Sequence, residues 1–214
     1  MIFVISAPSG TGKTTVLKIL GEKYHLTRLL TYTTRPVRQG ERDREDYLFC
    51  TEEEFRNLIA SNGLAEWASV YGYHYGTPRK VLEDTLKEGK SAILALDTQG
   101  ANRIKSDYPE LTILIALLPP SYQELENRIR HRQKETGENE SAVERRLSEV
   151  QKEIRILARY DYQIINTKPE EAADRLYQIL QKYPLNHVIA SPERAKQSRP
   201  LIPGLPRRKL RSSQ

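Results

Sequence analysis

The residues with the clearest chemistry lie at the start of the chain, in the stretch SAPSGTGKTT (6–15) that follows the apolar run MIFVI. Glycines at 10 and 12 let successive backbone N–H groups turn toward one anion, and a helix starting there adds its partial positive charge. Lys13 can then reach the β- and γ-phosphates of a nucleotide, while the hydroxyl of Thr14 can ligate Mg²⁺. This is the P-loop pattern, with Ala7 in place of its first glycine. We therefore predict a nucleoside triphosphate site, for ATP with Mg²⁺ on Thr14, made by Ala7, Pro8, Ser9, Gly10, Thr11, Gly12, Lys13, Thr14 and Thr15.

A second group of residues suits another phosphate. Arg35 and Arg38 flank Pro36 in TYTTRPVRQGERDREDY (31–47), and two guanidiniums on one short turn favour bidentate contacts to an oxyanion. Tyr47 and Tyr75 can donate hydroxyls to the same group. These residues also have purely structural interpretations, because the tyrosines could belong to a strand core and the charged run could be an exposed loop.

Glu66 and Thr77 have a similar ambiguity. Glu66 precedes Trp67 in a strand-like piece, where a buried carboxylate would be costly unless it met donors. It could equally be a solvated edge residue, and Thr77 before Pro78 could serve as a helix N-cap.

The elements that must position these residues alternate between strand and helix. Apolar runs of strand length at 2–6, 92–96, 112–118 and 162–166 are continuous, which is typical of strands buried on both faces of a parallel sheet. Helices are indicated by a capping box at Thr51 and Glu54, by Thr77–Pro78 with Gly89 as the end, by Ser121 with Glu124, and by apolar residues at helical spacing over 140–159. The polar stretch 130–141 is expected to be an irregular, mobile segment.

Composition limits the class of protein. With 38% hydrophobic and 29% charged residues the chain is expected to be soluble, and it has no apolar run long enough for a membrane span. A single cysteine, Cys50, excludes an internal disulfide and favours the cytoplasm.

The positive net charge is confined to the end of the chain. Residues 184–214 hold seven basic and one acidic residue, and the other 183 residues hold 27 of each. This tail also contains five of the twelve prolines and is predicted to be disordered. Nucleic acid is therefore an unlikely partner for the body, and binding by the tail stays an open alternative to a solvated extension.

Taken together, SAPSGTGKT, TTRPVRQGE with DY, EW with YGYHYGT, and DTQG resemble the guanylate kinases over about residues 2–182. The resemblance implies an α/β P-loop kinase with a central parallel sheet flanked by helices, a small inserted lobe that binds the nucleoside monophosphate, and a mobile lid. The expected division is a core of 1–32, 78–129 and 150–183, an acceptor-binding lobe of 33–77, a lid of 130–149, and the tail.

The same resemblance implies roles for individual residues. Arg35, Arg38, Tyr47 and Tyr75 would hold the phosphate of GMP, while Thr31, Glu66, Thr77 and Asp97 would read its guanine. Catalysis would depend on Lys13, Arg38 and two lid arginines, Arg132 and Arg146. A carboxylate suits guanine because N1–H and N2–H₂ donate side by side, whereas adenine would present a lone pair at N1.

The sequence departs from the family pattern at two places. Ala95 stands where an acid is usual, so Mg²⁺ is expected to rest on Thr14, phosphate oxygens and water. His131 and Gln133 flank Arg132 where glycines are usual. Besides ATP:GMP phosphotransfer, two functions stay open: a kinase for another acceptor such as a ribose phosphate, and a weakly catalytic nucleotide-binding scaffold. The oligomeric state is not predicted.

Overall fold

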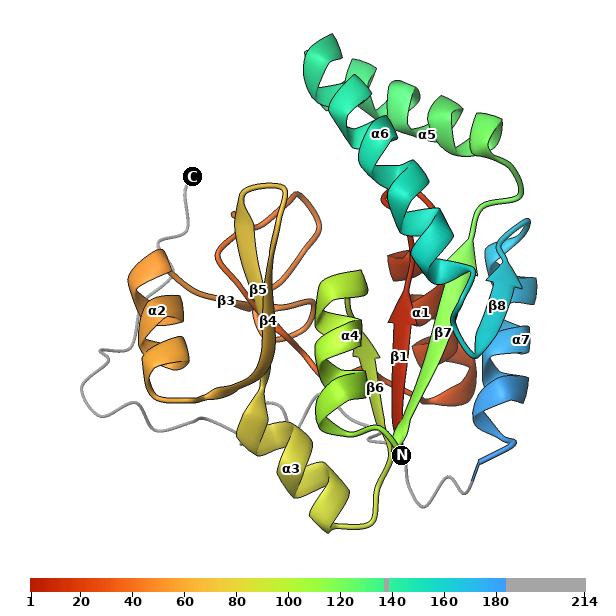
Figure 1. Cartoon of the computed structure of the whole chain (residues 1–214). Helices are drawn as coiled ribbons and strands as arrows, with labels where there is room; N and C mark the ends of the chain where they lie inside the picture. The colour runs from red at the N-terminus through yellow and green to blue at the C-terminus, as the bar shows by residue number, and fades with distance from the viewer. Residues whose placement is uncertain (137–138, 184–214) are drawn as a thin grey trace.

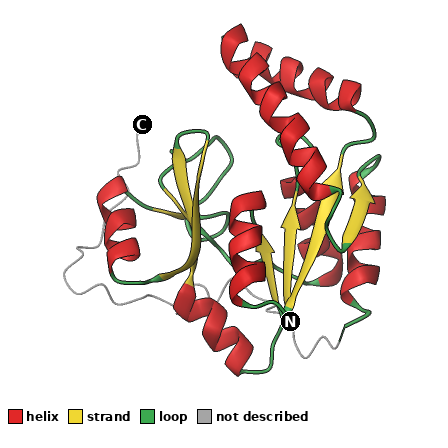
Figure 2. Cartoon of the chain, in the orientation of Figure 1, coloured by secondary structure: helices red, strands yellow, loops and turns green. Residues whose placement is uncertain are grey.

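The computed structural model describes residues 1–136 and 139–183, and the side chains of 132–136, Ala142, Arg145 and Arg146 lie outside that description. The tail expected at 184–214 is also outside the described residues. Within these bounds the predicted fold class is confirmed: the chain is α/β, with one parallel sheet flanked by helices (Figures 1 and 2).

The central sheet has the order β6-β1-β7-β8, and every pair in it is parallel. Its strands are Ile2–Ser6 (β1), Ala92–Ala95 (β6), Thr112–Leu118 (β7) and Tyr162–Ile165 (β8), as the apolar runs predict. Because Ile5 pairs with Ala95, the loop after β1 and the residues after β6 leave the same edge of the sheet side by side.

Helices cover both faces of this sheet (Figure 1). Phe3, Ile5 and Ile115 face a buried cluster with α1 (Lys13–Tyr24) and α7 (Pro169–Leu180). On the other face Val4 and Leu94 join a cluster that includes residues of α3 (Arg79–Lys87), α4 (Thr98–Asp107) and the end of α6 (Glu140–Leu157). The P-loop and the end of β6 are thus supported by packed apolar layers on both sides.

A second sheet lies beside the first, with the order β3-β2-β5-β4. Its strands are Tyr32–Thr33 (β2), Leu48–Phe49 (β3), Leu64–Val70 (β4) and Tyr73–Pro78 (β5), and α2 (Glu52–Ala60) packs on it. The predicted capping box is present, because Thr51 Oγ accepts from the Glu54 amide and the Glu54 side chain accepts from the Thr51 amide.

Two local predictions were wrong. The stretch 130–141 is largely helical, since α5 (Tyr122–Thr136) runs through its first part and α6 begins at Glu140. Thr77 does not cap α3: it lies in β5, Pro78 occupies the N-cap position, and the Thr77 hydroxyl bonds elsewhere. Among the residues that the structure describes, no helix combines the length and apolar character needed to cross a bilayer.

Candidate active site

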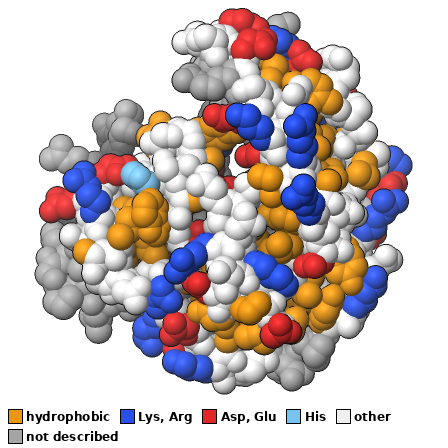
Figure 3. Space-filling model, in the orientation of Figure 1, with side chains coloured by type: hydrophobic (Ala, Val, Ile, Leu, Met, Phe, Trp, Pro, Cys, Tyr) orange, Lys and Arg blue, Asp and Glu red, His pale blue; other side chains and the backbone are white. Residues whose placement is uncertain are grey.

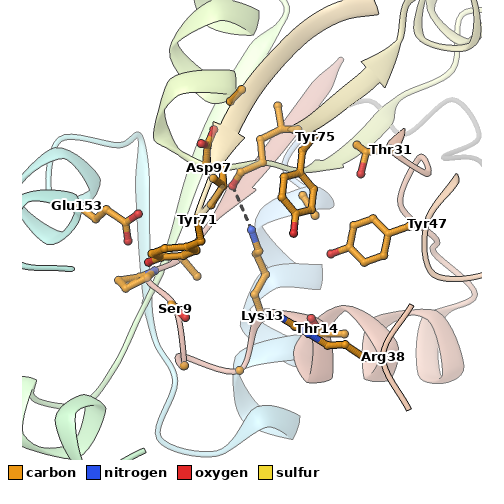
Figure 4. Close-up of a pocket in the computed structure, with 18 of the residues that line it drawn as sticks. Ser9, Lys13, Thr14, Thr31, Arg38, Tyr47, Tyr71, Tyr75, Asp97 and Glu153 are labelled. Atoms are coloured by element: carbon orange, nitrogen blue, oxygen red, sulfur yellow. Dashed lines mark hydrogen bonds between the residues drawn. The ribbon is translucent and has the colours of Figure 1, made fainter. Parts of the chain in front are cut away.

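A cavity of about 570 Å³ is lined by residues of both sheets and of the arm formed by α5 and α6. The space-filling view is notched between the second sheet and that arm (Figure 3). The lining comes from the P-loop, the second sheet, the end of β6 and α6, and it includes Ser9, Lys13, Thr14, Thr31, Arg38, Tyr47, Glu66, Tyr75, Asp97 and Glu153 (Figure 4). The cavity thus brings together residues that the sequence separates by more than 140 positions.

The P-loop has the backbone conformation that its glycines allow. Gly10 and Gly12 have φ values of 85° and 94°, which side chains disfavour, and Gly12 is the N-cap of α1. Asn166, just after β8, donates from Nδ2 to the Thr11 carbonyl at 2.6 Å. A Cβ on Gly12 would lie 2.9 Å from that Nδ2, so the loop is closely packed against Asn166.

Lys13 extends from the start of α1 across the cavity floor. Its ammonium donates to the Leu96 carbonyl at 3.1 Å, drawn as the dashed line in Figure 4. Burial lowers the pKa of Lys13 to about 8, and the positive charge of Arg28 acts in the same direction. An anion placed here would therefore meet a cation with little solvent to screen it.

Glu66 is buried beside the start of α4. It is only 4% exposed, and its Oε1 accepts a 2.6 Å hydrogen bond from Thr77 Oγ1. Gly100 makes room for it, because a Cβ there would lie 2.5 Å from Glu66 Oε2. Burial raises the pKa of Glu66 to about 7, and the charge of Asp97 adds to the rise. The interpretation of Glu66 as a solvated edge residue is therefore wrong, whereas its neighbour Trp67 is 48% exposed.

The loop between β2 and β3 carries Arg35, Arg38 and Tyr47, and β5 carries Tyr75. Arg35 is buried, with Nε donating to the Tyr75 hydroxyl at 3.2 Å and Nη2 to the Glu41 carboxylate at 2.8 Å. Arg38 and Tyr47 line the cavity. Arg38 thus brings a positive charge to the cavity wall, in addition to Lys13 of the P-loop.

The predicted residues are not all in the cavity wall. Thr11 is fully buried, Thr15 is exposed at the start of α1, and neither is part of the lining. Arg35 and Thr77 act on the cavity through Tyr75 and Glu66. Arg132 lies on α5 and Arg146 on α6, but their side chains are outside the described part of the chain.

Sequence reasoning missed several residues of the site. Glu153, Arg128 and Tyr71 line the cavity, and Asn166 and Gly100 support its walls. Gly100 had a signal, since it belongs to the DTQG motif. No motif indicated Glu153, because helical spacing places it on α6 without showing that this helix lines the same cavity as the P-loop.

The chain is similar in sequence and structure to known enzymes. The family model described as "Guanylate kinase" matches residues 1–183. The guanylate kinase of Caldanaerobacter subterraneus subsp. tengcongensis is 38% identical over 181 residues, covering 84% of this chain and 86% of that protein. That of Clostridium tetani is 40% identical over 180 residues, with 84% and 85% covered. The crystal structure of guanylate kinase from Anaplasma phagocytophilum, 35% identical, superposes with a TM-score of 0.69 over 85% of each chain. With a P-loop facing a buried glutamate across one cavity, and with relatives at this level of identity, the chain belongs to the guanylate kinase family.

Proposed function

We propose that this protein transfers the γ-phosphoryl group of ATP to GMP or dGMP, forming ADP and the corresponding diphosphate. The observation that carries this proposal is the placement of Glu66, held by Thr77, in the same cavity as Lys13 and the P-loop. A ribose phosphate acceptor would offer that buried carboxylate no donors beyond Thr77, at a cost of about 1–3 kcal/mol for an acceptor left unsatisfied.

The Glu66 pocket has the polarity of a guanine site. An ionised Glu66 accepts together from N1–H and N2–H₂, and the hydroxyl of Thr31 and the carboxylate of Asp97 are available to the base edge. Thr77 acts through its hydrogen bond to Glu66. Adenine lacks this pair of donors, so we expect AMP to be a poor acceptor.

The acceptor phosphate is assigned to the part of the cavity lined by Arg38, on the loop between β2 and β3. Arg38, Tyr47 and Tyr75 line the cavity. Arg35 is held by Glu41 and acts through Tyr75, to whose hydroxyl it donates. In this assignment residues 33–77 are the acceptor-binding lobe, and 130–149 form a lid that carries Arg132 and Arg146 to the transferring group.

The donor triphosphate is assigned to the P-loop, with Lys13 leaving the Leu96 carbonyl to contact the β- and γ-phosphates. The residues present fit Mg²⁺: the Thr14 hydroxyl lines the cavity at the start of α1, and carboxylates lie nearby at Asp97 and Glu153. When bound, Mg²⁺ neutralises charge on the phosphate oxygens. Transfer then depends on positioning and charge neutralisation, with no strong base required.

Product analysis tests this proposal. Purified protein given Mg·ATP and GMP should form ADP and GDP in equal amounts, as separated by anion-exchange chromatography. Lys13→Met should remove turnover while the protein stays folded. Formation of ADP without GDP would contradict phosphotransfer to GMP.

A further inference from the structure

Glu153 is a charged side chain of the cavity to which the assignments above give a place near the metal but no contact of its own. It lies on α6, and Figure 4 shows its carboxylate directed from that helix into the cavity. Its Oε2 is buried and has no hydrogen-bond partner among the described residues. Lys13 and Asp97 are near enough for their charges to act on it.

A structural role does not account for this arrangement. A buried acceptor without a partner costs about 1–3 kcal/mol, and the two oxygens of a carboxylate have about four acceptor positions to satisfy. Ion pairs hold other acids of the α5–α6 arm, such as Glu124 with Arg128 and Glu144 with Arg130. Glu153 faces the site where the phosphates of the donor are placed, so a direct contact to the nucleotide would be repulsive.

A donor that arrives with the nucleotide would supply the missing partner. Mg²⁺ binds through one or two protein oxygens and keeps several waters, which donate hydrogen bonds to nearby carboxylates. On β6, Ala95 offers the cavity only a methyl group, and the Asp97 carboxylate already accepts from the Gly100 amide at 2.8 Å. Among the described carboxylates that line the cavity, Glu153 is the one with a buried oxygen that has no hydrogen-bond partner.

We propose that Glu153 is a positioning residue for the metal: it accepts hydrogen bonds from water on the Mg²⁺ that accompanies ATP. Helix α6 in this way supplies the acid that β6 lacks at Ala95. The inference rests on the proposed function only in placing Mg·ATP at the P-loop.

The test compares Glu153→Gln with Glu149→Gln, a matched variant at an exposed position one turn earlier on the same helix. The dissociation constant of ATP is measured by calorimetry for the full chain, once in excess EDTA and once at saturating Mg²⁺. The ratio of the two constants is the gain in affinity that the metal provides. Loss of an outer-shell partner typically costs about 10-fold or more in metal affinity.

In Glu153→Gln we expect the gain in ATP affinity from Mg²⁺ to fall roughly 10-fold. The dissociation constants of ATP in EDTA and of GMP should stay unchanged. Glu149→Gln should keep the wild-type gain. If the glutamine variant does not fold, Glu153→Ala should show the same loss. A wild-type gain in the folded Glu153 variant would overturn the proposal. So would an equal weakening with and without Mg²⁺, which is the result expected if Glu153 instead pairs with Arg128.

The test is independent of turnover. If the wild-type protein formed no GDP, the proposed function would fail, but the effect of Glu153 on metal-dependent ATP binding could still be measured.

Discussion

Glu66 is a buried acid, and its protonation state decides which nucleobase it can hydrogen-bond. In the free enzyme burial raises its pKa to about 7, with Asp97 adding to the rise and Thr77 Oγ1 opposing it. Two guanine donors stabilise the ionised form, so binding of GMP should shift Glu66 toward the carboxylate.

Replacing Glu66 by glutamine tests this role. The amide presents a single acceptor and a clashing donor to guanine, so we expect GMP affinity to fall roughly 10- to 100-fold while ATP affinity stays unchanged. Separate titrations of the two nucleotides measure both effects. Equal losses for ATP and GMP would refute Glu66 as the residue that reads the base.

The raised pKa also predicts a pH dependence. Below about pH 7 the free enzyme holds Glu66 protonated, and GMP binding must release that proton, so affinity should rise with pH up to about 7 and then level off. The GMP phosphate itself titrates near pH 6 and acts in the same direction. The profile of Glu66→Gln isolates that second contribution. Identical pH profiles for the two proteins would contradict the prediction.

Individual residues differ in how well their sequence signal reveals them. Lys13, Glu66 and Tyr75 were predicted as site residues because they belong to motifs with a recognisable order and spacing, and all three line the cavity. Glu153 and Asn166 could not be found in this way, because their proximity to the P-loop depends on how α6 and β8 pack. The partner of Arg35 was also unpredicted, although Glu41 is only six positions away.

Among the elements, β8 acts on the P-loop through the residue that follows it. Asn166 holds the Thr11 carbonyl, so Asn166→Ala should lower the free energy of unfolding by about 1–3 kcal/mol and weaken ATP binding by roughly 5- to 10-fold. Asn166→Asp should be worse than alanine, since a carboxylate would face that carbonyl and the bound phosphates. Thermal unfolding and ATP titration measure these effects. Unchanged ATP affinity in Asn166→Ala would show that this contact does not organise the loop.

The α5–α6 arm explains why the stretch 130–141 was wrongly expected to be irregular. Its charge density resembles that of a loop, but Arg130 forms ion pairs with Glu126 on α5 and with Glu140 and Glu144 on α6. Below this network Leu125 and Ile129 pack on an apolar face of α6. Charges that a single-sequence reading assigns to solvent are here paired between neighbouring helices, which only the packing of the two helices reveals.

At the scale of the whole molecule, the periodic elements were predicted most completely. The four strands of the central sheet were each found from continuous apolar runs, because burial on both faces leaves a pattern that a short window detects. The second sheet was less predictable, since β2 and β3 have only two residues each and the pairing joins residues far apart, such as Tyr32 and Gly76.

The excess positive charge of the molecule lies beyond the part that matches the family model. A chain ending at residue 183 should therefore keep the same kcat/KM for GMP as the full chain. Steady-state kinetics of both chains measure this. Binding of both chains to a labelled DNA duplex at low and high salt tests separately whether the tail contacts nucleic acid. A loss of kinase activity on truncation would contradict the assignment of the complete site to residues 1–183.

The most direct test of the central claim is a comparison of acceptors. ADP release from Mg·ATP is measured with GMP, AMP, UMP, CMP and a ribose phosphate in parallel. A guanine site built on Glu66 predicts turnover with GMP and little or none with the others. Turnover with GMP would also show that Ala95 is compatible with catalysis. Preferred turnover with another acceptor, or ATP binding without turnover on any of them, would contradict the account.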